Sequence, residues 1–250
     1  MPAGPAIEVL PDTDAFARRV AGWVLDIALA SNDRFAVALS GGSTPRAVYE
    51  LLASPSYRKR FPWDRAHWFW GDERFVPHDN LRSNYGMAWK AFLSHAPAPS
   101  ANIHPVPTEG MTAQAAAAEY ERQLGAFYGK AKLDSSRPLF EINLLGLGEN
   151  GHFASLFPGA SALDERQRWV AATSDPQSEL RITLTYPALE SSRHAAFLIT
   201  GNAKAQMLQR LIAGDETIPA GRFHPAGAYY IFADQAAVGP SKIPSGTNRL

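Results

Sequence analysis

Short apolar runs alternate with helical patterns along this chain, and this alternation limits the possible folds more than any other feature of the sequence. The segments 35–39, 67–70 and 140–145 are short, largely apolar and bounded by turn residues, which is typical of buried strands. Strands that alternate with helices favour an α/β fold in which the sheet is mainly parallel.

Helices are predicted between and after these strands. Asp12 is a suitable N-cap for the first helix, whose apolar residues recur at helical spacing up to residue 27. Further helices are expected at 85–93, 112–128 and 203–213, and further strands at 181–185, 195–200 and 229–233. No proline- or glycine-rich linker and no internal repeat divides the chain, so we predict a single domain over residues 1–250, with 1–6 as a frayed arm.

The charge balance and the absence of cysteine exclude several classes of function. The 250 residues include 24 basic and 24 acidic side chains, and this zero net charge lacks the basic excess that favours nucleic acids or anionic membranes. The chain contains no cysteine, which excludes disulfides, thiolate nucleophiles and cysteine-ligated metals. No window approaches the roughly 20 apolar residues that cross a bilayer. Residues 1–6 lack a secretory pattern, so a cytoplasmic globular protein is expected.

Polar residues cluster directly after three of the predicted strands. The loop 40–44 follows the first strand, 72–74 follows the second, and 148–152 follows the strand at 140–145. Because ligands of open α/β sheets bind beyond the carboxyl ends of the strands, we expect these loops to converge on one crevice.

The first of these loops has the composition of an anion-binding turn. It consists of Ser40, Gly41, Gly42, Ser43 and Thr44 and leads into a helix, whose N-terminal N–H groups and dipole favour a phosphate. A second interpretation, equally open at this point, is a tight turn in which Thr44 only caps a helix that begins at Pro45. The loop is not a Walker motif, because no Gly-Lys-Ser/Thr follows it.

The third loop contains His152, and its glycine spacing allows two interpretations. Gly146, Gly148 and Gly151 fit the G-x-G-x-x-G pattern of dinucleotide-binding turns, but Pro158 interrupts the helix that this pattern requires. We therefore favour a turn that presents His152 to the crevice, where an imidazole suits proton transfer near neutral pH. A lone histidine is also common as a satisfied core or surface residue, and no metal-ligand spacing surrounds this one.

Two basic residues lie at the beginnings of predicted elements in the second half of the chain. Arg181 opens a predicted strand, and Lys204 falls in the first turn of a predicted helix, where the helix dipole disfavours a cation. Both fit ordinary solvated charges, whereas a nearby anion would explain the position of Lys204.

The ordered set of motifs resembles the 6-phosphogluconolactonase family through most of the chain. The matching segments are SGGSTP at 40–45, WGDERFVP at 70–77, SNY at 83–85, LLGLG at 144–148, GHFASLFP at 151–158, RITLT at 181–185, GNAK at 201–204 and PA at 225–226. The resemblance implies a modified Rossmann-like fold, shared with glucosamine-6-phosphate and ribose-5-phosphate isomerases, with helices on both faces of a mainly parallel sheet. It also implies hydrolysis of 6-phosphoglucono-1,5-lactone to 6-phosphogluconate in the oxidative pentose phosphate pathway, with no cofactor and no metal.

The resemblance also implies roles for single residues. His152 corresponds to the general base, and Asp72 is expected to orient the attacking water or a sugar hydroxyl. The loop 40–44, Arg74, Arg181 and Lys204 correspond to the groups that bind phosphate and substrate. Asn150 departs from the family's Asp-Gly-His segment: it forms hydrogen bonds but carries no charge. We expect it to orient the imidazole or contact the substrate, and the simpler alternative is that it only shapes a tight turn.

Two other functions stay open at this point. The first is an aminosugar-phosphate isomerase or deaminase of the same fold; the resemblance implies that such enzymes carry a Gly-His-Ile-Ala-Phe-Asn-Glu-Pro segment. Here the equivalent stretch ends Leu156-Phe157-Pro158, without the glutamate. A non-catalytic sugar-phosphate sensor would need a DNA-binding unit, for which the chain has no basic arm. The expected partner is a small phosphosugar lactone, with no nucleic acid and no membrane. The oligomeric state stays open, and a monomer is compatible with the sequence.

Overall fold

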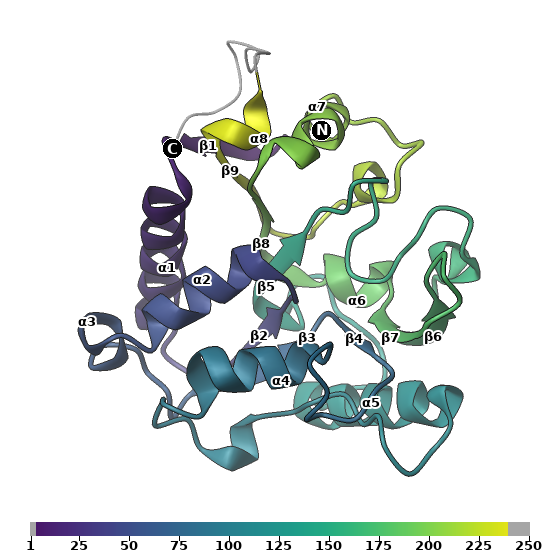
Figure 1. Cartoon of the computed structure of the whole chain (residues 1–250). Helices are drawn as coiled ribbons and strands as arrows, with labels where there is room; N and C mark the ends of the chain where they lie inside the picture. The colour runs from purple at the N-terminus through teal and green to yellow at the C-terminus, as the bar shows by residue number, and fades with distance from the viewer. Residues whose placement is uncertain (1–3, 240–250) are drawn as a thin grey trace.

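The computed structural model describes residues 4–239, and its centre is a six-stranded sheet (Figure 1). The strands lie in the order β1 (Ala6–Leu10), β9 (Ala228–Asp234), β8 (Ser192–Ile199), β5 (Phe140–Gly146), β2 (Phe35–Leu39) and β3 (Ala66–Trp70). All neighbouring pairs in this sheet are parallel. The prediction of an α/β fold with a mainly parallel sheet is therefore confirmed.

The long helices form where the sequence pattern predicts them, and several short ones are added. Their bounds are α1 (Thr13–Ala30), α2 (Ser43–Leu52), α3 (Pro55–Arg58), α4 (Asn84–Ala88), α5 (Ala113–Tyr128), α6 (Tyr186–Glu190), α7 (Ala205–Ile212) and α8 (Gln235–Val238). Asp12 caps α1 by accepting a hydrogen bond from the N–H of Ala15 at 2.7 Å, as expected. No helix between residues 4 and 239 is long and apolar enough to cross a membrane.

Helices cover both faces of the parallel sheet. Side chains alternate between the two faces along each strand, so neighbouring residues point in opposite directions. On one face, Trp23 of α1 packs edge-on against Tyr230 of β9, with ring centroids 5.1 Å apart. On the other face, Phe153 packs between Phe197 of β8 and Tyr186 of α6. The sheet is thus buried on both sides, which explains why its strands are almost continuously apolar.

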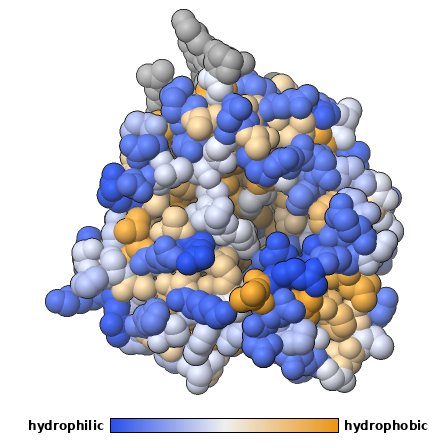
Figure 2. Space-filling model, viewed as in Figure 1, coloured by the Kyte–Doolittle hydropathy of each residue, from blue (hydrophilic) through white to orange (hydrophobic). Residues whose placement is uncertain are grey.

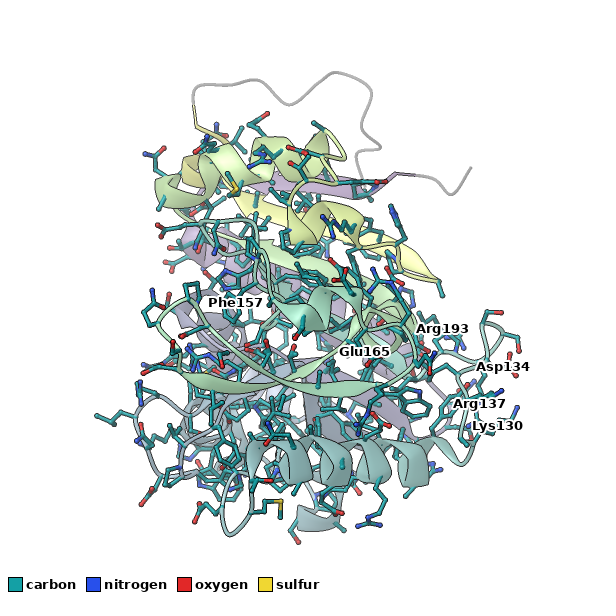
Figure 3. The ribbon with its side chains drawn as sticks, turned by 90° about the vertical axis from the view of Figure 1, so that its right-hand side faces the viewer. Lys130, Asp134, Arg137, Phe157, Glu165 and Arg193 are labelled. Carbon is teal, nitrogen blue, oxygen red and sulfur yellow. The ribbon has the colours of Figure 1, made fainter. Side chains whose placement is uncertain are left out.

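A second, antiparallel sheet differs from the sequence prediction. It consists of β4 (Asp72–Arg74), β7 (Leu180–Leu184) and β6 (Val170–Ser174), in the order β4-β7-β6. The segment 72–74 was expected to be a polar loop and is instead an edge strand, because three polar residues carry no strand pattern until a neighbour pairs with them. The predicted strand at 181–185 belongs to this sheet and not to the parallel one. Figure 3 shows the β6–β7 hairpin lying over α5, which packs against both strands.

The N-terminal segment also differs from the prediction. Of the expected frayed arm, residues 1–3 lie outside the described range, and Ala6 opens strand β1. This strand pairs with β9 along its whole length, from Ala6 beside Tyr230 to Leu10 beside Asp234. A five-residue strand whose pairing partner lies more than 200 residues away has no local signal in the sequence.

The strand order of the parallel sheet reverses between β2 and β5. From β2 the chain runs to β3 on one side, and every later strand of this sheet joins on the other side. The connections after β2 and β5 therefore diverge and leave a crevice at the carboxyl edge, which is where ligands of such sheets bind. The loops 40–44 and 148–152 follow these two strands, so the fold brings two of the predicted site loops together.

A half-buried histidine pair, formed by His67 of β3 and the neighbouring His104, makes the stability of the fold depend on pH. His67 Nδ1 and His104 Nε2 lie 3.0 Å apart, and the ring of His104 stacks on Phe69. Burial, together with the neighbouring His67, lowers the pKa of His104 from 6.5 to about 4. As the pH falls through this interval, the unfolded chain binds the proton before the folded chain does, so the free energy of unfolding decreases.

We expect His104→Phe to flatten this pH dependence. The phenylalanine keeps the contact with Phe69 but cannot bind a proton. Because the ring is only half-buried and water screens part of the effect, we expect a difference in slope worth about 1 kcal/mol between pH 6.5 and 4.5. Denaturant unfolding at a series of pH values measures it, with the exposed His95→Ala as the control. Equal slopes for His104→Phe and the wild type would show that this pair does not titrate with folding.

Candidate active site

A cavity of about 690 Å³ opens at the carboxyl edge of the sheet, where the strand order reverses. Figure 2 shows this face hollowed near its middle, with hydrophilic side chains around the hollow. Of the predicted site residues, those that line the cavity are Ser40, Gly41, Gly42, Asp72, Arg74, Asn150, His152, Arg181 and Lys204. Ser43 and Thr44 do not line it. A cavity of this size and polarity fits a small polar ligand.

The loop 40–44 contributes only its first half to the cavity. Helix α2 begins at Ser43 and its N-cap is Gly42, so the interpretation of Thr44 as a cap is wrong. Instead, Thr44 Oγ1 lies 2.5 Å from Thr200 Oγ1, a hydrogen bond that ties the start of α2 to the end of β8. Because Gly42 has no side chain to accept hydrogen bonds from the first turn, the N–H groups there stay available to an anion.

Two arginines occupy directly opposed positions on neighbouring strands of the antiparallel sheet, beside the cavity. Arg74 of β4 is directly opposite Arg181 of β7, and both line the cavity. Like charges in directly opposed positions destabilise a sheet. Carboxylates beside Arg181 offset part of this repulsion, and an anion bound in the cavity could contact both guanidinium groups.

Arg181 and Lys204 are not ordinary solvated charges. Arg181 Nη2 lies 2.6 Å from Asp175 Oδ2 and 3.2 Å from Glu179 Oε2. The side chains of Arg181 and Asp175 are almost fully buried, whereas that of Glu179 is partly exposed. Lys204 Nζ lies 3.7 Å from Glu149 Oε1, on the rim of the cavity. Within the described residues, Arg181 uses only Nη2 in hydrogen bonds, so its other N–H groups stay free to bind a ligand.

The side chain of His152 is fixed by the turn that carries it. Gly151 N–H donates to the carbonyl of Gly148 at 3.0 Å, and the G-x-G-x-x-G segment ends in this turn without opening a helix. A Cβ atom at Gly148 would lie 2.0 Å from His152 Nδ1, so only glycine allows the imidazole to lie there. On another side, the ring of Phe157 packs at a centroid distance of 4.6 Å.

Asn150 determines which nitrogen of His152 carries the proton. The backbone N–H of His152 donates to Asn150 Oδ1 at 3.2 Å, which identifies this atom as the amide oxygen facing the histidine. The same oxygen lies 2.5 Å from His152 Nδ1 and can only accept, so Nδ1 must carry the hydrogen. Nε2 is then unprotonated in the neutral ring, and within residues 4–239 it has no hydrogen-bond partner. Its lone pair is available to a water molecule in the cavity.

The surroundings keep His152 in its neutral form. Burial lowers the pKa of His152, Asp72 opposes this shift, and the cations Lys204, Arg181 and Arg74 add to it. The imidazole is therefore unprotonated near neutral pH and able to accept a proton. Asp72 would stabilise the imidazolium that forms when it does so.

Asp72 is itself held in place by two neighbours. Ser155 Oγ donates to Asp72 Oδ2 at 2.6 Å, and Asn84 Nδ2 donates to the backbone carbonyl of Asp72 at 2.9 Å. Asp72 makes no direct hydrogen bond to His152 among the described contacts, so it acts on that ring through its charge. Asp72 thus lies where it can also contact a ligand hydroxyl or water in the cavity.

The cavity-lining residues to which the sequence analysis gives no role include Asn84, Ser155 and Asp175. Asn84 and Ser155 belong to segments that carry the family resemblance, and their residue types do not by themselves indicate chemistry. Asp175 precedes a proline in an apparent turn, and only the folded hairpin brings it against Arg181. A buried hydrogen-bonding role depends on tertiary contacts, which local sequence patterns do not contain.

The comparison with known proteins agrees with this α/β fold. Residues 11–231 match the family described as glucosamine-6-phosphate isomerases/6-phosphogluconolactonase. The chain therefore belongs to this family. A protein from Nostoc described as 6-phosphogluconolactonase is 37% identical over 237 residues, which covers 92% of this chain and 96% of that protein. A chloroplastic 6-phosphogluconolactonase from Arabidopsis thaliana is 39% identical over 201 residues, which covers 78% of this chain and 59% of that protein.

Solved structures show the same fold. A 6-phosphogluconolactonase from Trypanosoma cruzi superposes with a TM-score of 0.83 at 29% identity, covering 97% of this chain and 99% of that one. The 6-phosphogluconolactonase from Thermotoga maritima has a TM-score of 0.79 at 30% identity, covering 92% of this chain and 100% of that one. A monomeric glucosamine-6-phosphate deaminase reaches 0.80 at 20% identity, with 94% and 99% covered, which shows a shared fold alone.

Proposed function

We propose that this protein is a 6-phosphogluconolactonase, which hydrolyses 6-phospho-D-glucono-1,5-lactone to 6-phospho-D-gluconate in the oxidative pentose phosphate pathway. The observation that carries the proposal is the free Nε2 of His152, which faces a cavity lined by three cationic side chains. A neutral base beside an anion site is what the hydrolysis of a phosphorylated ester requires. The names of the relatives and the family membership support the same activity.

The cationic side of the cavity binds the phosphate of the substrate in this proposal. The N–H groups at the start of α2 and the side chains of Arg181 and Lys204 supply hydrogen bonds and positive charge. Arg74 adds charge from the opposite strand. Anchoring the phosphate fixes the lactone ring, so that its carbonyl carbon lies within reach of a water on His152. Ser43 and Thr44 contribute through the backbone of α2 and not through their side chains.

The chemistry then needs one proton carrier. Nε2 of His152 removes a proton from the attacking water as the water adds to the carbonyl carbon, and the ring becomes an imidazolium. The tetrahedral intermediate collapses, the bond from the carbonyl carbon to the ring oxygen breaks, and the imidazolium returns its proton to that oxygen. Asp72 stabilises the charged ring between the two steps, and Asn150 keeps the Nδ1–H tautomer throughout.

The aminosugar-phosphate deaminase is the second candidate, because a deaminase shares the fold. In the segment after His152, the side chain that packs on the imidazole is Phe157, an apolar ring in place of a carboxylate. The site therefore favours ester hydrolysis over the ring opening of an aminosugar. A sugar-phosphate sensor without catalysis would have no use for a free base aimed at the cavity.

A substrate panel separates these candidates. The purified protein is incubated with the phosphorylated lactone and, separately, with glucosamine-6-phosphate. We expect 6-phosphogluconate from the first and neither ammonia nor fructose-6-phosphate from the second. Release of ammonia would favour the deaminase, and binding of both sugar phosphates without turnover would favour the sensor.

Asn150 gives a prediction about pH. We expect Asn150→Asp to have a turnover similar to the wild type above neutral pH, because a carboxylate oxygen also accepts from Nδ1–H. Its negative charge favours the imidazolium and raises the pKa of His152, so activity should decline at a higher pH than in the wild type as the solution is acidified. The turnover rate measured against pH tests this. In Asn150→Ala the turnover rate should be about tenfold lower than in the wild type, because the imidazole loses the hydrogen bond that orients it. A gain of a hundredfold or more in Asn150→Asp, roughly 2.7 kcal/mol in the barrier, would instead show that the carboxylate is essential.

The remaining expectations from the sequence stay predictions. We treat residues 1–250 as one domain, because residues of both sheets share one apolar core among the described residues. The cytoplasmic location stays a prediction, and a plant relative is described as chloroplastic. The oligomeric state is open.

A further inference from the structure

Asn84 lies where three parts of the site meet. It is the first residue of α4, it is only 2% exposed, and it lines the cavity. Its Oδ1 accepts a hydrogen bond from Arg74 Nη1 at 2.6 Å, and its Nδ2 donates to the backbone carbonyl of Asp72 at 2.9 Å. One amide thus holds a substrate-binding cation and the strand residue that carries the site's carboxylate.

The third contact of Asn84 is with the loop after β2. A Cβ atom at Gly41 would lie 1.9 Å from Asn84 Oδ1 and 2.9 Å from Nδ2, so the loop backbone rests directly on the amide. The backbone of Asn84 is fixed as well, because its N–H donates at 2.7 Å to Oε1 of the fully buried Glu73. The position of the amide is therefore determined from every side that faces the site.

Arg74 differs from the other two cations of the cavity in its partners. Arg181 pairs with Asp175 and Glu179, and Lys204 pairs with Glu149. Among residues 4–239, no carboxylate lies within 4.0 Å of the Arg74 guanidinium; its side-chain hydrogen bonds go to Asn84 Oδ1 and to the carbonyl of Arg82. Both acceptors are neutral, so the guanidinium is oriented without being neutralised.

We propose that Asn84 is a positioning residue which orients Arg74 with an uncharged acceptor, so that the full positive charge of Arg74 acts on an anionic substrate. This inference rests on the proposed lactonase function and deepens it. A carboxylate at the same place would orient Arg74 equally well but cancel its charge. A smaller apolar residue would preserve the charge but release the guanidinium.

Two substitutions at this position separate charge from packing. Asn84→Asp has nearly the same shape and neutralises Arg74, but it also puts an acceptor oxygen where Nδ2 donates to the carbonyl of Asp72, a loss that the control below reproduces. Asn84→Ala leaves a small void and an Arg74 with no acceptor at this position. Dissociation constants for 6-phosphogluconate, measured by calorimetry, and kcat and KM for the lactone are compared with the wild type. We expect Asn84→Asp to weaken binding of 6-phosphogluconate and raise KM at least tenfold. Asn84→Ala should weaken binding less than Asn84→Asp, with its main loss, about tenfold, in kcat.

The order of the affinities decides the outcome. If Asn84 only fills space, the nearly isosteric Asn84→Asp must bind better than Asn84→Ala, and that order would overturn the proposal. Asn102→Asp is the matched control, since Asn102 is also a buried amide that donates to a backbone carbonyl, that of Asp64, away from the cavity. We expect its affinity to stay within twofold of the wild type. An equal loss in this control would assign the effect to buried charge in general and would also overturn the proposal.

A double-substitution cycle covers the case in which Asn84→Asp does not fold. The methyl group of Gly41→Ala would displace the Asn84 amide from Arg74. Gly41 also belongs to the phosphate-binding loop, so the test is a ratio: we expect the fold-loss in kcat from Gly41→Ala to be at least three times larger in the wild type than in Asn84→Ala, where no amide is left to displace. Equal losses in both backgrounds contradict the inference. If the wild type neither hydrolyses the lactone nor binds 6-phosphogluconate, the proposed function fails; if it does both and these orders are reversed, only the role of Asn84 fails.

Discussion

Replacing His152 by alanine is expected to abolish enzymatic hydrolysis of the lactone. The imidazole is the one neutral base facing the cavity among the described residues, and Nε2 serves both proton transfers of the proposed mechanism. General acid–base catalysis contributes about 10²–10⁴-fold, so kcat should fall by at least that factor toward the spontaneous rate. Rates with the phosphorylated lactone, corrected for spontaneous hydrolysis, measure the loss.

The fold and the phosphate site should survive this substitution. The hydrogen bonds that shape the turn use the backbone N–H and carbonyl of residue 152, which alanine retains. We therefore expect an unchanged thermal unfolding midpoint, within a few degrees, and unchanged affinity for 6-phosphogluconate. His95→Ala, at an exposed position outside the cavity, is the control and should keep wild-type turnover. Near-normal turnover in His152→Ala would remove His152 from the mechanism.

The second large effect is expected at Lys204. Each charge-assisted hydrogen bond to a phosphate contributes about 1.5–3 kcal/mol, so Lys204→Ala should raise KM for the phosphorylated lactone about tenfold or more. The unphosphorylated glucono-1,5-lactone lacks the group that Lys204 contacts, and its kcat/KM should change less than twofold. Steady-state kinetics with the two lactones measure this difference. Equal penalties on both would place Lys204 away from the phosphate.

The control for Lys204 is a lysine with a similar ion pair elsewhere. Lys130 lies 3.2 Å from Asp134 beyond the end of α5, and Figure 3 shows both far from the cavity-lining Phe157. Lys130→Ala should leave the kinetic constants for both lactones unchanged.

Arg181 requires a milder change, because Arg181→Ala leaves Asp175 buried and unpaired, which typically costs about 3–5 kcal/mol of stability. Arg181→Lys preserves the charge. It should also raise KM more for the phosphorylated than for the unphosphorylated lactone, but by a smaller factor than Lys204→Ala does.

Much of the fold was predictable because its strands carry strong local signals. The strands β2, β3 and β5 are short apolar runs followed by turns, and burial on both faces is what makes them apolar. The convergence of two site loops also follows from the sequence, since parallel strands bring their carboxyl ends to one edge. His152 and Asn150 follow β5 and therefore lie at that edge.

The antiparallel sheet and the internal contacts of the site were not predictable in this way. The strand β4 is three polar residues, Asp72–Arg74, and it becomes a strand only because β7 pairs with it. The opposition of Arg74 and Arg181, more than 100 residues apart in the chain, arises from that same register. Likewise, Asn84 gains its role from side chains on β4 and from the loop at Gly41. Each of these features depends on pairing between distant segments, which local patterns do not encode.

The most direct test is the initial rate of lactone disappearance with the purified wild-type protein in the presence of a chelator, after the spontaneous rate is subtracted. A neutral His152 that acts with no metal or cofactor predicts a rate proportional to protein concentration. One equivalent of 6-phosphogluconate should form for each lactone consumed, and activity should decline only below the ordinary pKa of histidine, because burial lowers the pKa of His152. A rate no greater than the spontaneous one, or a rate that the chelator removes, would contradict it.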